Sequence, residues 1–199
     1  MPRICAVLLA CGGRFFTGFK FIFELSIKPS SLVRSSGYNT SNLTSIKQNL
    51  TRELTLYPKC FKCVHFNAQS IQPLWNEIRT IVEDVDLHVI LISESWLKPS
   101  LSDNIVRIPG YVLLRHDREG RRGGGVAAYV RDDFPHKIVT RSEPFPSNPG
   151  PKYMAVQVTL RTIKLLVVVV YKPPDVHNLN GIDVLLSDSM SFYEHIIIM

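Results

Sequence analysis

The spacing of apolar residues changes twice between residues 62 and 93, which predicts three successive elements. The segment KCVHF over 62–66 is short and β-prone, so we expect a strand there. Over 73–85 apolar residues recur at every third or fourth position, as on one face of an amphipathic helix. The run LHVILIS over 87–93 is apolar almost throughout, which is typical of a strand buried on both faces. A strand, a helix and a strand within about 30 residues have the size of a βαβ unit.

Short apolar runs separated by turns follow as far as residue 199. Glycine and proline mark the loops between them, and the segment HDREGRR over 116–122 reads as a charged turn. The last run, HIIIM, begins a further strand at residue 195, and a helix is expected over 176–195. This mixture of strands and helices predicts an α/β (α+β) fold. The other expected strands lie over 111–115, 123–133, 153–160 and 163–171.

Residues 1–59 lack a clean apolar period. Within them, residues 29–51 are rich in Ser, Thr and Asn, which predicts a linker or a disordered segment. We therefore expect a poorly defined, partly disordered N-terminal extension over 1–59 and a domain over 60–199. The start MPRICAVLLACGG is weak evidence for a signal peptide, and no apolar run reaches the ~20 residues of a membrane span. We expect an intracellular protein, nuclear or cytoplasmic, that enters no membrane.

The charge balance and the cysteines narrow the choice of ligands. Lys and Arg outnumber the acidic residues 23 to 17 and give a net charge of +6, which favours polyanions such as nucleic acid. The four cysteines are too few and too clustered for a disulfide framework. Cys60 and Cys63, with His65 nearby, have the spacing of part of a zinc site, but a structural site needs four ligands and no second pair follows. We expect reduced thiols here.

Three polar residues each close or follow an apolar strand: Asn67, Glu94 and Tyr171. Strand ends are positions where a rigid scaffold presents reactive side chains. We expect these three to meet at one edge of the sheet, with Glu94 and Asn67 within the ~10 Å that one magnesium ion and its shell can bridge. The alternative is that each residue makes only a local hydrogen bond at a strand end.

Four phrases, in this order and at fitting separations, carry a resemblance to a known family: FNAQSI, LISESWL, IPGYVLLRHDREGRRGGGVAAYV and VVVVYKPP. From residue 62 to residue 199 the chain resembles the N-terminal half of the endonuclease/exonuclease/phosphatase (deoxyribonuclease I-like) domain. Within that family it resembles the endonuclease domain of non-long-terminal-repeat retrotransposons. The resemblance implies an incomplete four-layer α/β/β/α sandwich.

The resemblance also implies roles for the strand-end residues. Glu94 matches the glutamate that binds a divalent metal, usually Mg²⁺, and Asn67 matches an asparagine that helps to bind the metal or the scissile phosphate. Tyr171 matches a tyrosine that hydrogen-bonds near that phosphate, although a strand-end aromatic that covers the core is the alternative. The basic turn implies phosphate contacts on DNA, with a solvated hairpin turn as the alternative, through Arg115, Arg118, Arg121 and Arg122.

Two phrases of the family are absent from the 199 residues. They are the G-D-x-N phrase, whose aspartate activates water, and the S-D-H phrase, whose histidine completes the acid–base apparatus. We therefore interpret the chain as the N-terminal part of a Mg²⁺-dependent DNA endonuclease, a hydrolase of a retrotransposon-derived protein, that is inactive as this fragment. One alternative is a non-catalytic remnant or nucleic-acid-binding module. Another is a phosphoesterase of the same fold that acts on a non-DNA phosphodiester.

Overall fold

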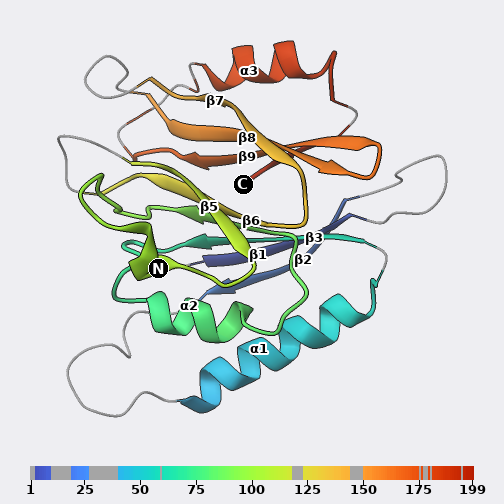
Figure 1. The fold of residues 1–199 in the computed structure, drawn as a ribbon, viewed down its shortest axis with the longest axis vertical. Helices are drawn as coiled ribbons and strands as arrows, with labels where there is room; N and C mark the ends of the chain where they lie inside the picture. Colours follow the sequence, from blue (N-terminus) through green and yellow to red (C-terminus); the bar gives the residue numbers. More distant parts are fainter. Residues whose placement is uncertain are drawn as a thin grey trace.

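A computed structural model describes residues 3–9, 19–26, 40–58, 60–117, 123–143, 150–174, 176, 179, 181–193 and 195–199. The described residues form two β-sheets packed face to face between helices, so that four layers lie in the order α/β/β/α (Figure 1). The α/β class and the layer order agree with the expectation. Among the described residues, no helix is both long and apolar enough to cross a bilayer.

The first sheet has six strands and the second sheet has four. In spatial order the first contains β2 (Phe19–Ser26), β1 (Arg3–Leu9), β3 (Phe61–Asn67), β4 (Val89–Ser93), β6 (Val126–Arg131) and β5 (Tyr111–His116). The second contains β10 (His195–Ile198), β9 (Ile163–Tyr171), β8 (Lys152–Leu160) and β7 (His136–Arg141). The helices are α1 (Thr40–Thr55), α2 (Trp75–Val82) and α3 (Ile182–Ser189), with a 3₁₀ turn, η2, over Asp103–Val106.

Three apolar cores separate the four layers. Strand β4 lies between two of these cores, which explains why its sequence is apolar without a break. Ile90 and Ile92 point into the core between the first sheet and helices α1 and α2. Val89 and Leu91 point into the core between the two sheets. Because successive side chains of a strand point to opposite faces, a strand covered on both faces needs apolar residues at every position. A third, smaller core lies between the second sheet and α3.

The strand register places four residues from distant parts of the chain in one row across the first sheet. β3 and β4 run parallel with Asn67 opposite Ser93. Ser93 lies opposite Val126, and Val126 lies opposite His116. We call Asn67, Ser93, Val126 and His116 the site rung. Because the rung lies at the carboxyl ends of β3 and β4, the segment that begins with Glu94 leaves the sheet there.

The structure differs from the sequence-based expectation before residue 60. The expected linker or disorder is wrong for residues 40–51, because α1 occupies Thr40–Thr55. Ile46, Leu50 and Leu54 recur at four-residue intervals and are buried against the first sheet with α2. Three apolar residues on one face are enough when tertiary contacts stabilise the helix, although the surrounding composition is polar. Residues 29–39 lie outside the described residues, and the domain boundary at residue 59 stays a prediction.

Two further segments of the N-terminal region belong to the first sheet. β1 pairs antiparallel with β3, and β2 pairs antiparallel with β1. At the other end of the chain, the helix expected over 176–195 is shorter than predicted. It begins after Gly181, whose φ of +85° takes the left-handed conformation that glycine adopts at low cost, and it ends at Ser189.

Candidate metal site at the ends of β3 and β4

Asn67 and Glu94 lie side by side where their two strands end. The Asn67 Nδ2 amide donates a hydrogen bond to Glu94 Oε1 at 3.0 Å. The expected closeness of these two residues is confirmed, whereas their roles stay predictions. The buried Asn67 Oδ1 has no hydrogen-bond partner among the described residues. A buried carbonyl oxygen without a partner costs on the order of 1–3 kcal/mol, so Asn67 Oδ1 is a candidate ligand atom at this position.

The donor set fits a hard cation. Mg²⁺ takes oxygen ligands from one or two carboxylates, from carbonyl groups and from water. A carboxylate and an amide oxygen on adjacent strand ends supply two such ligands, and the hydrogen bond from Asn67 to Oε1 leaves the other carboxylate oxygen of Glu94 for the ion. The described residues contain no group of three His, Cys, Asp or Glu that could hold a metal. Such an ion would therefore keep much of its water shell.

The backbone after each strand takes an unusual conformation. Glu94 has a φ of +53°, Trp96 has +54°, and Gln69 and Ser70 in the facing loop have +46° and +97°. Left-handed conformations of residues with side chains are strained and persist where surrounding contacts enforce them. Here Ser70 N–H donates to Glu94 O at 2.9 Å, and Ile71 N–H donates to Ser95 O at 3.0 Å. The two loops therefore fix each other, and with them the direction of the Glu94 side chain.

The glycine run holds the other side of the Glu94 loop. Ser95 N–H donates to Gly125 O at 3.1 Å, and Trp96 N–H donates to Gly124 O at 2.9 Å. All three glycines have positive φ, and a Cβ on Gly123 would lie 3.4 Å from Trp96 Nε1. Glycine adopts positive φ at low cost, so residues Gly123 to Gly125 suit a turn that needs this conformational freedom. The run fixes the loop that carries the candidate ligand.

Arg115 has a structural role that the sequence did not reveal. Its guanidinium has five N–H donors, and five hydrogen bonds use them. Nε and Nη2 bind the Asp117 carboxylate, Nη1 binds Asp103 Oδ1 and Leu101 O, and Nη2 also binds Lys98 O. The Asp117 hydrogen bond is the main reason that the pKa of Arg115 is raised. The predicted phosphate contact of Arg115 stays untested, and it would have to displace one of these bonds. The other three predicted arginines lie outside the described residues: Arg118, Arg121 and Arg122.

Tyr171 belongs to the second sheet, at the same end of the sandwich as the site rung. It lies opposite Lys152 in the register, and the next residue, Tyr153, accepts a hydrogen bond from Ser142 N–H at 3.0 Å. His116 of the site rung bridges the sheets, with Nε2 at 2.8 Å from Ser142 O and 3.2 Å from Ser142 Oγ. Three of the expected site residues are thus on one side of the molecule, but they come from two sheets instead of one.

The His116 bridge is one that sequence reasoning missed. Burial lowers the pKa of His116 to about 4, so the ring is neutral at pH 7 and its Nε2–H donates to Ser142 O. The two residues are 26 positions apart, and no spacing in the sequence connects them. His116 stood next to the arginines of the charged turn, and that neighbourhood suggested solvent and phosphate in place of a contact between sheets.

Cys60, Cys63 and His65 do not form a metal site among the described residues. Cys60 and Cys63 are buried as free thiols, and burial raises the pKa of the Cys63 thiol well above its usual value. A protonated thiol is a poor metal ligand. His65 Nε2 lies 3.0 Å from Ser93 Oγ, and burial lowers its pKa to about 4. His65 therefore contacts Ser93 of the site rung as a neutral ring.

Comparisons with known proteins identify no family for the chain. No protein-family model matches it, and no curated protein matches its sequence. Among solved structures, a humanized D. rerio TDP2 with 14 mutations matches with a TM-score of 0.39 and 17% identity, over 80% of this chain and 56% of that one. D. rerio TDP2 complexed with a single-strand DNA product matches with a TM-score of 0.37 and 16% identity, over 80% and 53%. This chain thus spans about half of the length of either protein, and at these TM-scores the likeness carries no argument about function.

Proposed function

We propose that Asn67 and Glu94 form the metal-binding part of an active site of the endonuclease/exonuclease/phosphatase type. On this proposal the chain is the N-terminal part of a Mg²⁺-dependent DNA endonuclease of a retrotransposon-derived protein. The observation that carries the proposal is the buried Asn67 Oδ1, which lacks a hydrogen-bond partner among the described residues and adjoins the Glu94 carboxylate. The four sequence phrases that resemble the family support the choice of reaction.

Each side chain has a defined task in this proposal. Asn67 Nδ2 holds Glu94 Oε1 by a hydrogen bond, and this bond orients the carboxylate before any ligand arrives. Asn67 Oδ1 and the second carboxylate oxygen are then the two protein ligands of the ion. Bound Mg²⁺ would supply a positive charge that polarises a phosphoryl oxygen. Tyr171, from the second sheet, would hydrogen-bond to the phosphodiester from the opposite side of the same end.

We further propose that this chain by itself does not cut DNA. One carboxylate and one amide leave Mg²⁺ largely hydrated. The aspartate and histidine that the family uses as acid–base groups are absent from the sequence, and loss of such groups commonly costs ~10² to 10⁴ in rate. The second candidate function is a non-catalytic nucleic-acid-binding module, which the net charge of +6 favours.

Calorimetric titration with Mg²⁺ and Mn²⁺ tests the site. We expect weak binding, with Kd near ~1 mM, that Glu94→Gln weakens at least tenfold because the only charged ligand is lost. Asn67→Asp should instead strengthen binding several-fold, because it adds a second carboxylate. Glu83→Gln, which changes an exposed residue at the C-terminal end of α2, is the matched control and should leave binding unchanged. Equal affinities for all four proteins would contradict the proposal.

A further inference from the structure

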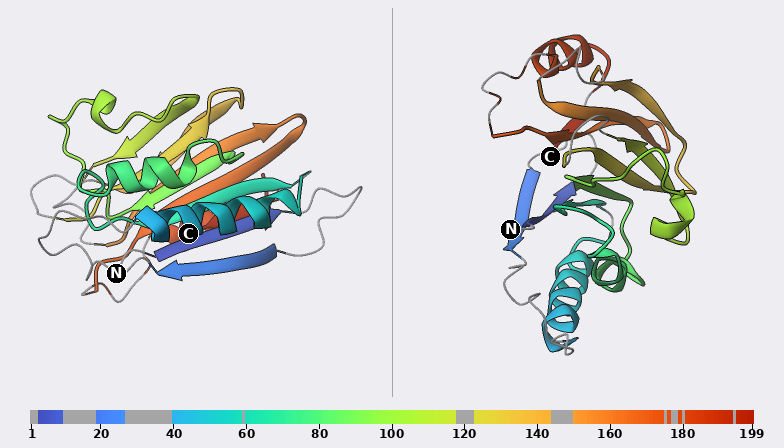
Figure 2. Two further views of the ribbon diagram at one scale, coloured as in Figure 1. Left: turned by 90° about the horizontal axis from the view of Figure 1, so that it is seen from below. Right: turned by 90° about the vertical axis from the view of Figure 1, so that its left-hand side faces the viewer.

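The segment that begins with Glu94 leads from the metal site to the edge strand β5. It runs from the end of β4 to the 3₁₀ turn η2, and η2 lies beside β5 at the edge of the first sheet (Figures 1 and 2). On β5, Arg115 lies opposite Ala127 in the register and precedes His116 of the site rung by one residue. Arg115 is therefore one position away from the row that contains Asn67.

Arg115 binds this segment through backbone atoms at two points. Its Nη2 donates to Lys98 O at 2.5 Å, and its Nη1 donates to Leu101 O at 3.0 Å. Leu101 N–H in turn donates to Lys98 O at 2.9 Å, so the two carbonyl groups belong to one tight turn. We call the two bonds from the guanidinium to these carbonyl groups the Arg115 clamp. A lysine has one nitrogen in place of the planar fork and cannot reproduce the clamp.

Two carboxylates hold the guanidinium in the orientation that the clamp requires. Asp117 accepts from Nε and Nη2 as a bidentate pair, and Asp103 accepts from Nη1 at 2.6 Å. The Arg115 side chain is 14% exposed and the Asp117 side chain is 10% exposed, so their pair is largely shielded from solvent. Bidentate pairs fix the plane of a guanidinium as well as its position. Arg115 therefore fixes the turn over residues 98–101 relative to β5.

The short stretch between Glu94 and the clamp is held along its length. Ser95 N–H and Trp96 N–H donate to the glycine run, and Leu97 is only 2% exposed in the core between the first sheet and helices α1 and α2. Glu94 has a φ of +53°, which a residue with a side chain keeps only where its surroundings enforce it. The glycine run holds the near end of this stretch, and the clamp holds its far end at Lys98, four residues after Glu94.

We propose that Arg115 is a positioning residue for Glu94, which it holds in place through the backbone of residues 94–101. This inference rests on the proposed function, because the task of Arg115 is to orient a ligand of the proposed Mg²⁺ site. Mg²⁺ demands near-ideal octahedral geometry, whereas Ca²⁺ accepts flexible coordination. A loop that is held by the clamp therefore favours Mg²⁺ over Ca²⁺, and a loosened loop loses part of that preference. The five N–H donors of Arg115 are all used within the protein, which agrees with a positioning role.

Titrations with Mg²⁺ and with Ca²⁺, followed by the NMR shifts of the backbone amides in the Glu94 loop, test the positioning role. Arg115→Lys keeps the charge but breaks the clamp. It should weaken Mg²⁺ binding about tenfold, as is usual when a residue that orients a metal ligand is lost. Ca²⁺ binding should weaken by about threefold or less, so that the ratio of the two affinities falls. Asp103→Asn changes a carboxylate that is 61% exposed, should leave the fold intact, and should lower the ratio by a smaller factor.

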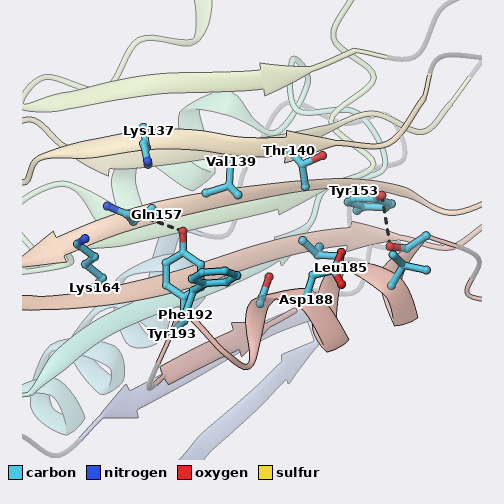
Figure 3. A pocket seen from close by; sticks show the side chains of 13 residues that line it. Lys137, Val139, Thr140, Tyr153, Gln157, Lys164, Leu185, Asp188, Phe192 and Tyr193 are labelled. Atoms are coloured by element: carbon cyan, nitrogen blue, oxygen red, sulfur yellow. Dashed lines mark hydrogen bonds between the residues drawn. The ribbon is translucent and has the colours of Figure 1, made fainter.

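Two control variants separate positioning from general effects. Tyr111→Phe removes another hydrogen bond of β5, from Tyr111 Oη to Leu87 O at 2.7 Å. It should lower stability, but loss of folded protein changes both affinities by the same factor and leaves their ratio unchanged. Asp188→Asn tests for adventitious metal binding. Asp188 is an exposed carboxylate of α3 in a groove of about 760 Å³ on the outer face of the second sheet (Figure 3), and its loss should change neither affinity.

The same titrations distinguish a failure of this inference from a failure of the proposed function. If Glu94→Gln leaves Mg²⁺ binding unchanged, the proposed function fails, and the positioning role fails with it. If Glu94→Gln weakens Mg²⁺ binding but Arg115→Lys and Asp103→Asn keep the affinity ratio of the original chain, only the positioning role is overturned. Weaker binding of an oligothymidylate by Arg115→Met, with Mg²⁺ affinity unchanged, would instead assign Arg115 to the phosphate contact.

Discussion

Strands β3 and β4 have polar side chains at both of their ends. These side chains are paired with one another at the amino ends but only partly paired at the carboxyl ends. At the amino ends, Lys62 Nζ binds Asp86 Oδ2 at 2.6 Å and Arg131 Nη1 binds Asp86 Oδ1 at 2.8 Å. Arg131 also binds Asp133, and His88 Nδ1 accepts a hydrogen bond from Lys62 N–H at 2.7 Å. Each charge has an opposite charge beside it, and the hydrogen bond from Lys62 lowers the pKa of Asp86.

The carboxyl ends leave their polar atoms incomplete. Asn67 Oδ1 is buried without a hydrogen-bond partner among the described residues, and the Glu94 backbone has positive φ. A buried charge needs an opposite charge beside it, because an uncompensated buried charge is strongly destabilising. An unpaired oxygen of Asn67 beside the strained and firmly held backbone of Glu94 is expected where a fold keeps a ligand position open. The closed end therefore fits a structural role, whereas the binding role of the other end stays a proposal.

The largest expected effect is on nuclease activity, which should depend on the carboxyl ends of β3 and β4 and not on their amino ends. In a chain extended by the downstream half of the family's domain, Glu94→Gln should reduce plasmid nicking with Mg²⁺ by at least ~10²-fold, because a catalytic metal loses its charged ligand. Asp86→Asn, at the closed end, should keep most of the nicking activity. The unextended chain should not nick the plasmid. Metal-dependent nicking by residues 1–199 that Glu94→Gln abolishes would show that the half-site suffices.

The closed end should matter most for stability. The Lys62 side chain is only 5% exposed, and Lys62→Ala leaves Asp86 without its nearest cation. Breaking a buried pair costs about 3–5 kcal/mol, and the partial exposure of Asp86 reduces this to about 2 kcal/mol in the free energy of unfolding. Lys62→Met keeps the packing of the stem and should lose less. Urea denaturation measures the free energy of unfolding of both variants. A loss below ~0.5 kcal/mol for Lys62→Ala would show that the charge network contributes little to stability.

Low pH should destabilise the fold, because buried histidines that are neutral in the folded state take up protons more readily in the unfolded state. Burial lowers the pKa of His65 to about 4, below the unfolded value of about 6.5. Its contribution to stability is therefore fully present above pH ~6.5 and is lost as the pH falls toward 4. Between pH 7 and pH 5 the loss should be about 1–2 kcal/mol. Urea denaturation at a series of pH values should show this slope, and His65→Gln should flatten it.

The smallest effect concerns the glycine run that supports the Glu94 loop. Gly123→Ala should cost about 1 kcal/mol in stability, because φ is +86° and the new Cβ meets Trp96. Gly110→Ala is a matched control with φ of +78° and no atom within 4 Å of the added Cβ. We expect similar losses of stability from both, but weaker Mg²⁺ binding only from Gly123→Ala. Equal Mg²⁺ affinities of the two variants would show that the glycine run does not support the metal site.

The sequence by itself determined the parts of this protein that depend on local pattern. The continuous apolar run of β4 predicted a strand with both faces buried, and burial of all five of its residues agrees. The turn from apolar run to polar residue placed Asn67 and Glu94 at strand ends, and parallel pairing brings such ends together. These features are readable because alternation, helical spacing and turn residues act over a few positions at a time.

Only the tertiary structure decided which groups are paired and which remain open. The polar composition around α1 concealed a buried face of three residues, because their stabilisation comes from the sheet that they contact. The five bonds of Arg115 and the bridge from His116 to Ser142 join positions as far as 26 residues apart. Pairing between distant residues depends on how strands and loops are placed in space, and the order of residues along the chain does not encode that placement in any short motif.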